Sequence, residues 1–335
     1  MLPLEVIIAG VMVASLVLYA LLGGADYGGG VWDLFAFGPR ARRQRQLIAE
    51  AISPVWEANH VWLILVVVVL FTAFPTAFAT IATALHIPLT LMLIGIVLRG
   101  TAFTFRTYDV QRDNVQRRWG LIFSIASIIT PILLGTILGA IASGTIRVEN
   151  GAVASGFVNS WLAPFPLSVG FFALALFAFL AAVYLTVEAP ERELQEDYRW
   201  RALLSGVVVG LLALTVFILA KTGAPTVRAG ISRTWWALGL HFLTAIFATS
   251  AFVALWTRRY RLARFCAAAQ VTMILLGWAF AQFPNIVEPD ITISSAAAPP
   301  LTLELLSGAL VLGAIVLFPS YFYLFRIFKM TRSRS

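Results

Sequence analysis

Nine long apolar runs, separated by short polar gaps, dominate the pattern of this chain. A membrane-spanning helix needs about 20 apolar residues, and each run is close to that length. No gap is long enough for a separate soluble domain, so residues 1–335 are expected to form a single all-α polytopic membrane domain. The predicted spanning helices cover residues 4–24, 54–73, 77–98, 119–143, 161–187, 202–220, 235–256, 262–281 and 302–326.

Composition and charge support a membrane protein rather than a soluble one. The 335 residues are 60% hydrophobic and only 12% charged, and a soluble core of this length cannot bury so much apolar surface. The formal net charge of +8 would suit nucleic acid. The basic residues lie in the short gaps between apolar runs, however, where they act as topology signals. The expected partner is therefore the lipid bilayer and not nucleic acid.

The basic residues are concentrated in alternate gaps, which predicts the orientation of the chain. Basic side chains favour the cytoplasmic side of a membrane, so the N-terminus is expected outside and the C-terminus in the cytoplasm. One set of gaps, together with the C-terminal tail, holds 20 of the 24 basic residues. These are Arg40, Arg42, Arg43, Arg45, Arg99, Arg106, Arg112, Arg117, Arg118, Arg192, Arg199, Arg201, Arg258, Arg259, Arg261, Arg264, Arg326, Lys329, Arg332 and Arg334; the other gaps hold Arg147, Lys221, Arg228 and Arg233.

Polar residues interrupt the apolar pattern at the predicted cytoplasmic ends of the first helices. Asp26 lies about 22 residues along the first helix, roughly 33 Å from its start, and Glu57 lies in the first turn of the second helix. Asn59 and His60 continue this polar face toward the membrane core, and Arg99 closes the third predicted helix at the same depth. Ionisable groups at such depth mark a proton or ion route, a buried pair or a ligand site. The alternative is an interfacial position, where a first-turn carboxylate simply favours the helix dipole.

Glycines and tryptophans surround these polar residues. Glycines at positions 23, 24, 28, 29 and 30 bracket Asp26, and small residues permit either close helix packing or a break in the helix. Trp56 precedes Glu57. A tryptophan here is either an anchor at the membrane interface or a flat surface for a quinone or a lipid headgroup.

The sequence offers little for a metal or a haem. His60, His86 and His241 fall at three different predicted depths, so two histidines are not expected to ligate one haem; ligation by a histidine and a methionine stays open. Cys266 is the single cysteine and excludes a C-x-x-C-H haem attachment. No clustered histidines and cysteines suggest zinc. We therefore expect no metal site and no bound haem in this chain.

Three motifs together resemble subunit II of the cytochrome bd-type quinol oxidases. They are "GGADYGGGVWDL" at 23–34, "SPVWEANHVWLI" at 53–64 and "LRGTAFTFR" at 98–106. The resemblance is strong over residues 1–120 and mostly topological beyond them. Glu57 stands where the family usually has Asp, and His60 where it has Gln or Glu, which suggests a divergent branch such as the cyanide-insensitive type.

The resemblance implies a heterodimer in a bacterial or archaeal cell membrane. The homologous subunit I would carry haem b, haem d and the quinol site, and the complex would oxidise quinol and reduce dioxygen to water with protons from the cytoplasm. For this chain it implies a haem-free fold of two four-helix bundles, over about 4–143 and 161–281, with a peripheral ninth helix at 302–326. Whether a small accessory subunit exists stays open.

The resemblance also assigns roles to individual residues. Asp26 and Glu57 match acidic positions of a proposed proton pathway, with His60 beside them, and Arg99 is expected to be their charge partner. Trp56 matches a tryptophan associated in some members with a bound structural quinone. Two alternatives stay open: a proton-coupled secondary transporter built around Asp26, Glu57 and His60, and a scaffold subunit without a proton role.

Overall fold

Nine helices long and apolar enough to cross a membrane lie within the part of the chain that the computed structural model describes, residues 2–53, 56–108 and 113–327. The prediction of an all-α membrane protein with nine spans is thereby confirmed. The spans are α1 (Leu4–Leu34), α3 with α4 (Trp56–Asn59 and Val61–Ala73), α6 (His86–Tyr108), α7 (Asp113–Ala142), α8 (Pro164–Glu188), α9 (Arg192–Gly223), α11 (Trp235–Trp256), α12 (Tyr260–Gln282) and α14 (Pro300–Phe325).

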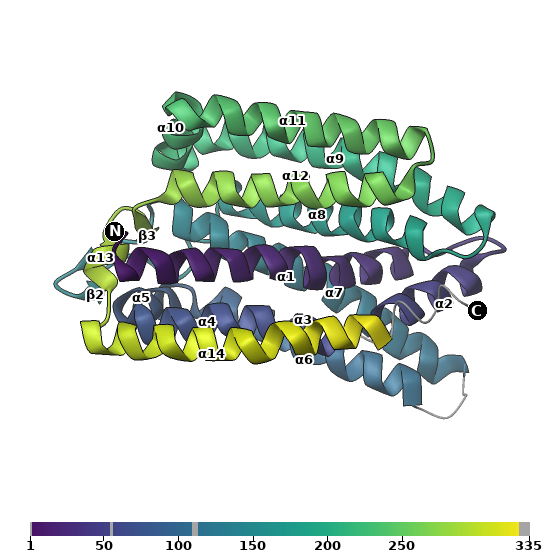
Figure 1. Cartoon of the computed structure of the whole chain (residues 1–335), viewed down its shortest axis with the longest axis horizontal. Coiled ribbons are helices and arrows are strands. Elements are labelled where there is room, and N and C mark those ends of the chain that lie inside the picture. The colour runs from purple at the N-terminus through teal and green to yellow at the C-terminus, as the bar shows by residue number, and fades with distance from the viewer. Residues whose placement is uncertain (1, 54–55, 109–112, 328–335) are drawn as a thin grey trace.

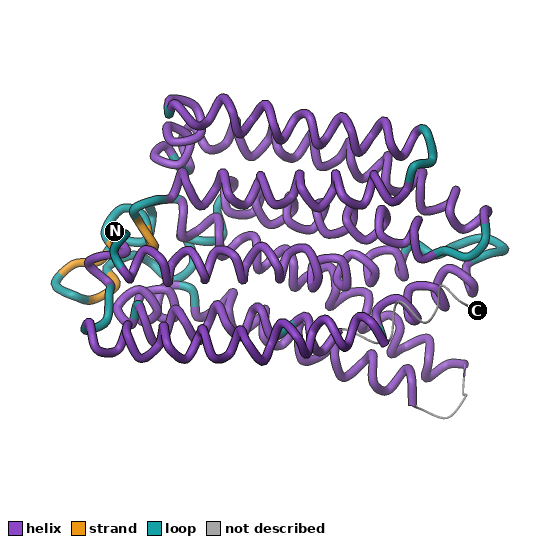
Figure 2. Tube along the Cα trace, viewed as in Figure 1, coloured by secondary structure: helices purple, strands orange, loops and turns teal. Residues whose placement is uncertain are grey.

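The long helices lie side by side along the long axis of the molecule (Figure 1). Helices α9, α11 and α12 lie at one side with α8, whereas α4, α6, α7 and α14 lie at the other with α1; α1 packs on α8 and joins the two groups. Short elements occupy the ends, as the tube in Figure 2 shows. They are α2 (Ala41–Ile52), α5 (Pro75–Ala84), α10 (Pro225–Arg233), α13 (Ile293–Ala296) and two antiparallel hairpins, β1 (Val148–Glu149) with β2 (Ala152–Val153) and β3 (Asn285–Val287) with β4 (Ile291–Thr292).

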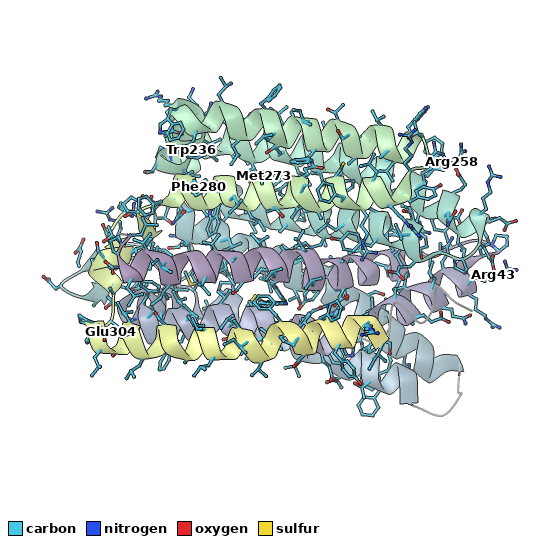
Figure 3. All side chains as sticks on the ribbon, in the orientation of Figure 1. Arg43, Trp236, Arg258, Met273, Phe280 and Glu304 are labelled. Carbon is cyan, nitrogen blue, oxygen red and sulfur yellow. The ribbon has the colours of Figure 1, made fainter. Side chains whose placement is uncertain are left out.

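Basic side chains gather at one end of the helices. Arg43 of α2 and Arg258, between α11 and α12, lie at the same end, and Glu304 of α14 lies at the opposite end (Figure 3). The two hairpins, α13 and the start of α1 are at the end of Glu304 (Figure 1). This separation is what the charge pattern requires if the end that carries α2 faces the cytoplasm.

The predicted third helix was wrong in its position. Residues 77–98 do not form one helix: α5 ends before Leu85 and α6 begins at His86 and continues to Tyr108. Because the turn between the two helices is itself apolar, hydropathy does not reveal it. His86 therefore begins a helix instead of lying at its middle, and Arg99 lies inside α6 instead of closing a helix.

The glycines around Asp26 serve close packing and do not break the helix, because α1 is continuous through all five of them. A Cβ atom on Gly28 would collide with the carbonyl oxygen of Phe177 in α8, and one on Gly30 would collide with Ser127 in α7. Three helices therefore approach closely beside Asp26. Small residues allow such an approach in membranes, where packing replaces the hydrophobic effect as the force between helices.

Replacing Gly28 by alanine should prevent normal packing of α1 on α8. The obstacle is a backbone carbonyl, which cannot rotate away as a side chain can, so the two helices must separate. Overpacking of this kind costs about 1–3 kcal/mol. We expect a large loss of monodisperse protein in detergent and a lower Tm. Gly10→Ala in the same helix is the control, because nothing lies within 4 Å of a Cβ there; equal behaviour of the two variants would contradict the packing role.

Candidate functional site

Asp26 is a buried carboxylate in the membrane-spanning part of α1. Asp26 is 7% exposed, and Asn59 is 2% exposed. Oδ2 of Asp26 accepts a hydrogen bond of 2.7 Å from Nδ2 of Asn59. A carboxylate removed from water is costly unless hydrogen bonds compensate. Asn59 lies where the helix of the second span is interrupted, because α3 ends at Asn59 and α4 begins at Val61. Between them, the His60 amide donates to the Glu57 carbonyl at 3.2 Å.

The last helix, α14, closes over this interruption. Tyr321 of α14 donates from its hydroxyl to the Ala58 carbonyl and, at 3.5 Å, to Oδ1 of Asn59. The amide group of Asn59 is therefore held at both ends, with its nitrogen on Asp26 and its oxygen on Tyr321. This fixes the direction of the hydrogen bond that Asp26 receives.

His60 lies in a cluster of aromatic rings next to Asp26. Its ring centroid is 5.9 Å from that of Tyr19, 6.1 Å from that of Tyr27 and 6.3 Å from that of Trp56. The Tyr19 hydroxyl donates to the Tyr27 hydroxyl at 3.3 Å, and both tyrosines are 1% exposed. His60 and Trp56 are half-buried. The cluster thus joins the interior of α1 to the partly accessible start of the second span.

Arg99 inserts a cation between three helices. It comes from α6, is 2% exposed, and lies with its guanidinium carbon 4.5 Å from the ring centre of Tyr27 in α1 and 5.2 Å from that of Phe123 in α7. Its Nε donates to Oγ of Ser127 at 3.2 Å. Its Nη2 is buried and finds no hydrogen-bond acceptor among the residues that the structure describes. A desolvated cation over an aromatic face is worth about 2 kcal/mol.

Glu57 is apart from this group. Its side chain is exposed, and within the described ranges it makes no hydrogen bond or ion pair. The expectation that Glu57 faces Asp26 across one polar surface is therefore not met, because Asn59 occupies that direction. Of the residues selected from the sequence, Asp26, Trp56, His60 and Arg99 converge on Tyr27 and its neighbours, and Glu57 does not.

Helix α2 forms a cover at the basic end, held by charged hydrogen bonds. Arg40 binds Asp197 of α9 through two bonds of 2.9 and 2.7 Å, and Gln44 donates to the same carboxylate at 2.8 Å. The hydrogen bond to Asp197 raises the pKa of the Arg40 guanidinium above its usual range. Ile48 and Ile52 lie one and two turns beyond Gln44 on the same buried side of α2. This side thus binds α9 near the start of α2 and packs its apolar residues close to α1 further along.

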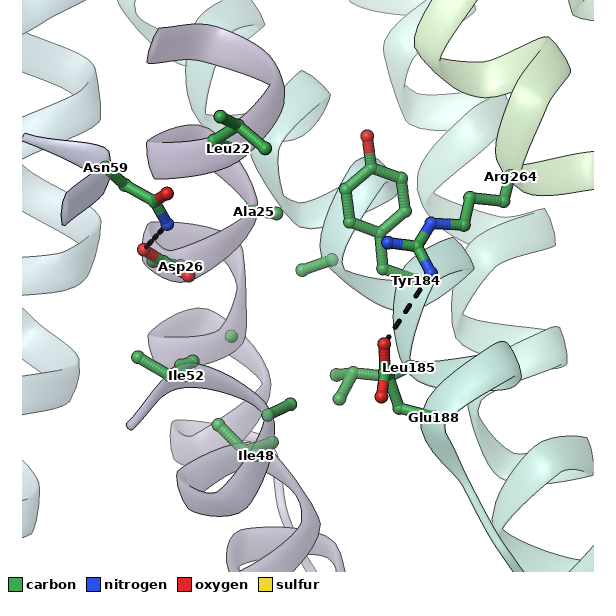
Figure 4. Close-up of a pocket in the computed structure, with 13 residues that line it drawn as sticks. Leu22, Ala25, Asp26, Ile48, Ile52, Asn59, Tyr184, Leu185, Glu188 and Arg264 are labelled. Carbon is green, nitrogen blue, oxygen red and sulfur yellow. Dashed lines mark hydrogen bonds and ion pairs between the residues drawn. The ribbon is translucent and has the colours of Figure 1, made fainter. Parts of the chain in front are cut away.

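A cavity of about 60 Å³ lies between α1, α2, α8 and α12 (Figure 4). Asp26 and Asn59 lie on one side of it, and Glu188 of α8 with Arg264 of α12 on the other, with Ile52 among the apolar residues that line it. Oε1 of Glu188 is 3.6 Å from Nη1 of Arg264. The cavity therefore has two polar sides, and the wall between them is apolar apart from the hydroxyl of Tyr184.

The part of the chain that is described contains no group of three His, Cys, Asp or Glu side chains suited to a metal ion. His86 is exposed at the start of α6, where its ring meets that of Phe157 at 5.1 Å, and His241 is exposed in α11. His60 lies between α3 and α4, so the three histidines come from three different spans.

Sequence reasoning did not find several residues of the site. In the sequence, Tyr19 and Tyr321 look like ordinary aromatic residues within apolar runs. No local pattern shows that Tyr19 contacts His60 or that Tyr321 contacts Asn59. Glu188 and Arg264 carried a signal: each is a charge at the end of an apolar run. That position is usual for interfacial residues, and sequence alone does not show that the two face each other.

Comparison with known proteins gives a consistent result. The family model "Cytochrome bd terminal oxidase subunit II" matches residues 4–328. A Bacillus subtilis protein, provisionally named cytochrome bd menaquinol oxidase subunit II, is 24% identical over 93% of this chain and 91% of its own length. The cytochrome bd-I ubiquinol oxidase subunit 2 of Escherichia coli is 25% identical over 60% of this chain and 52% of its own. A chain of the bd oxidase structure from Geobacillus thermodenitrificans has the same fold, with a TM-score of 0.83, 21% identity and coverage of 98% and 99% of the two chains.

Proposed function

The chain belongs to the cytochrome bd terminal oxidase subunit II family, whose members are part of a quinol:oxygen oxidoreductase complex, and from this premise we propose that it is the haem-free subunit of such an oxidase. The observation that carries the proposal is the family match over nearly the whole chain. Relatives that are themselves named as subunit II of a cytochrome bd oxidase support it. The family match also favours an oxidase subunit over a secondary transporter.

The proposed partner is a subunit I that carries haem b, haem d and the quinol site. The exposed apolar surfaces of several spanning helices supply area for lipid and for such a partner. We propose the arrangement expected from the sequence: two four-helix bundles with a peripheral ninth helix, the N-terminus outside and the C-terminus in the cytoplasm of the cell. The distribution of basic side chains supports this orientation.

The proposed contribution of this subunit to the reaction is a proton pathway through Asp26, with Glu57 and His60. The burial of Asp26 and the oriented bond that it accepts from Asn59 support this role, because an ionisable group inside a membrane protein is costly to retain without a function. Asp26 would accept a proton on its carboxylate and pass it on. Glu57 would be the exposed carboxylate of the route, and His60 lies between it and the buried tyrosines.

A structural quinone beside Trp56 is the second element of the proposal. The residues fit such a group: the half-buried indole of Trp56 offers a flat face, bounded by Phe103 at 5.7 Å between ring centroids, and aromatic rings stack on such faces. Gly100 keeps the backbone of α6 close to the indole. Bound there, the group would serve the structure of the complex.

A difference spectrum tests whether the subunit is haem-free. The affinity-tagged chain, expressed with and without its haem-bearing partner, is purified and measured reduced minus oxidised. With the partner, haem bands should co-purify with the tag in stoichiometric amount; alone, the chain should show no Soret band. A stoichiometric Soret band in the chain alone would contradict the haem-free assignment, and a tagged chain that never co-purifies a haem protein would contradict the oxidase assignment.

A further inference from the structure

The cavity between α1, α2, α8 and α12 lies where a path from the basic end of the molecule to Asp26 would run. We propose that it holds a short chain of water molecules through which Glu188 supplies protons to Asp26. This rests on the proton pathway proposed above and adds its missing link: Asp26 is buried, and Glu57, the carboxylate expected to feed it, is exposed and makes no bond to it within the described ranges.

The size and lining of the cavity suit water. A water molecule occupies about 30 Å³ in the liquid and, when buried, needs two to four polar partners. The cavity of about 60 Å³ therefore has room for a short chain of water molecules. Polar groups lie at both of its sides: Asp26 and Asn59 at the inner, buried side, and Glu188 and Arg264 at the outer side (Figure 4). The wall between them includes the apolar side chain of Ile52 and that of Tyr184, whose hydroxyl is a further polar group for a water to meet. A chain of waters would thus connect one carboxylate to the other.

Exposure falls along the cavity from one side to the other. The side chain of Arg264 is 38% exposed and that of Glu188 is 21% exposed, whereas Asp26 is 7% exposed and Asn59 only 2%. Glu188 ends α8 at the end that carries α2, the basic end of the molecule. The cavity thus has an outer carboxylate that is in contact with water and an inner one that is buried.

Arg264 suits Glu188 to this role. Its guanidinium carbon lies 4.8 Å from the ring centre of Tyr184, and the same guanidinium pairs with Glu188 at 3.6 Å. A long, partly exposed ion pair of this kind is weak, so Arg264 directs the Glu188 carboxylate toward the cavity without binding it tightly.

The proton moves from Glu188 to Asp26 by relay along the water chain. A hydronium ion in the water at the basic end of the molecule gives a proton to an oxygen of Glu188 and becomes water. The carboxyl group gives a proton to the first water of the cavity, while the last water gives one to the Asp26 carboxylate. Glu188 is then ionised again, the water chain is restored with its bonds reversed, and Asp26 holds the proton for onward transfer.

The test uses the assembled oxidase in detergent and in liposomes. Glu188→Gln keeps size and hydrogen bonding but does not titrate, so oxygen consumption with excess quinol should fall at least threefold, with proton uptake slowed equally. Glu188→Asp should keep more than half of the rate, which a purely structural role would not require. Glu191→Gln, an exposed carboxylate paired with Arg43 at the same end, is the matched control and should have no effect.

Ala25 provides a second test that leaves every charge in place. It lines the cavity, so Ala25→Leu should fill the space of the water and slow turnover about as much as Glu188→Gln, whereas Ala25→Ser should not. If Glu188→Gln and Ala25→Leu both assemble and work at the native rate while Asp26→Asn is slow, the cavity is not the route and the pathway through Asp26 stands. If Asp26→Asn is also at the native rate, the proton pathway itself fails.

Discussion

Replacing Asp26 by asparagine should leave the oxidase assembled and lower its oxygen consumption at least tenfold, which corresponds to about 1.4 kcal/mol of barrier. Asparagine has the size of aspartate, and its carbonyl oxygen can still accept the bond from Asn59. The packing around position 26 and the hydrogen bond from Asn59 are therefore retained. The side chain no longer takes up a proton, and the effect should appear in turnover and in proton uptake, with normal haem content and Tm.

Two further carboxylates calibrate this result. Glu57→Gln should lower the rate by less, about threefold, because an exposed group is more easily bypassed by water than a buried one; Glu57→Asp should restore it. Glu304→Gln is the control, since Glu304 is exposed at the opposite end of the molecule. An Asp26→Asn enzyme that respires at the native rate would remove the proton pathway and leave the chain as a scaffold for its partner.

The spans were predictable because each needs only a sufficient apolar length, a property of composition along the chain. Their boundaries were less so. Hydropathy merged α5 with the start of α6, because the turn is a single apolar residue, Leu85, and the one histidine after it hardly lowers the hydropathy of the run; this error moved Arg99 to the end of a helix. At α9 the helix begins at Arg192, ten residues before its apolar run, because a helix can extend past the membrane with a polar surface.

The sequence indicated which ends of the helices carry the polar residues of the site, but not which way their side chains point. Residues two apart on an α-helix point about 200° apart at 3.6 residues per turn, so Glu57 and Asn59 cannot share one face, yet both were assigned to it. Which of the two faces Asp26 depends on how the second span is rotated against α1. That rotation is set by the interruption at His60 and by Tyr321 of α14, 262 positions beyond Asn59 in the sequence, and local sequence carries no signal for such a contact.

Replacing Arg99 by alanine should sharply reduce the yield of assembled oxidase. Arg99 is among the largest fully buried side chains and touches Tyr27, Phe123 and Ser127 on two neighbouring helices. Its truncation leaves a cavity between three helices, and for large buried side chains this costs about 3–5 kcal/mol. Arg42→Ala is the matched control, because Arg42 is an exposed arginine of α2. Yield is measured as haem-containing complex per gram of membrane, and Tm by thermal unfolding of the purified complex.

Arg99→Met decides whether volume or charge is responsible. Methionine fills much of the same space without a cation, whereas Asp26, the residue before Tyr27, remains in the interior with its carboxylate. Removing one charge of a buried set leaves the other uncompensated, at a cost of about 3–5 kcal/mol. We therefore expect Arg99→Met to assemble as poorly as Arg99→Ala, and Arg99→Lys, which keeps the charge but loses the planar fork, to assemble better than either. Normal yield of Arg99→Met would show that Arg99 only fills space, and the charge partnership with Asp26 expected from the sequence would then be wrong.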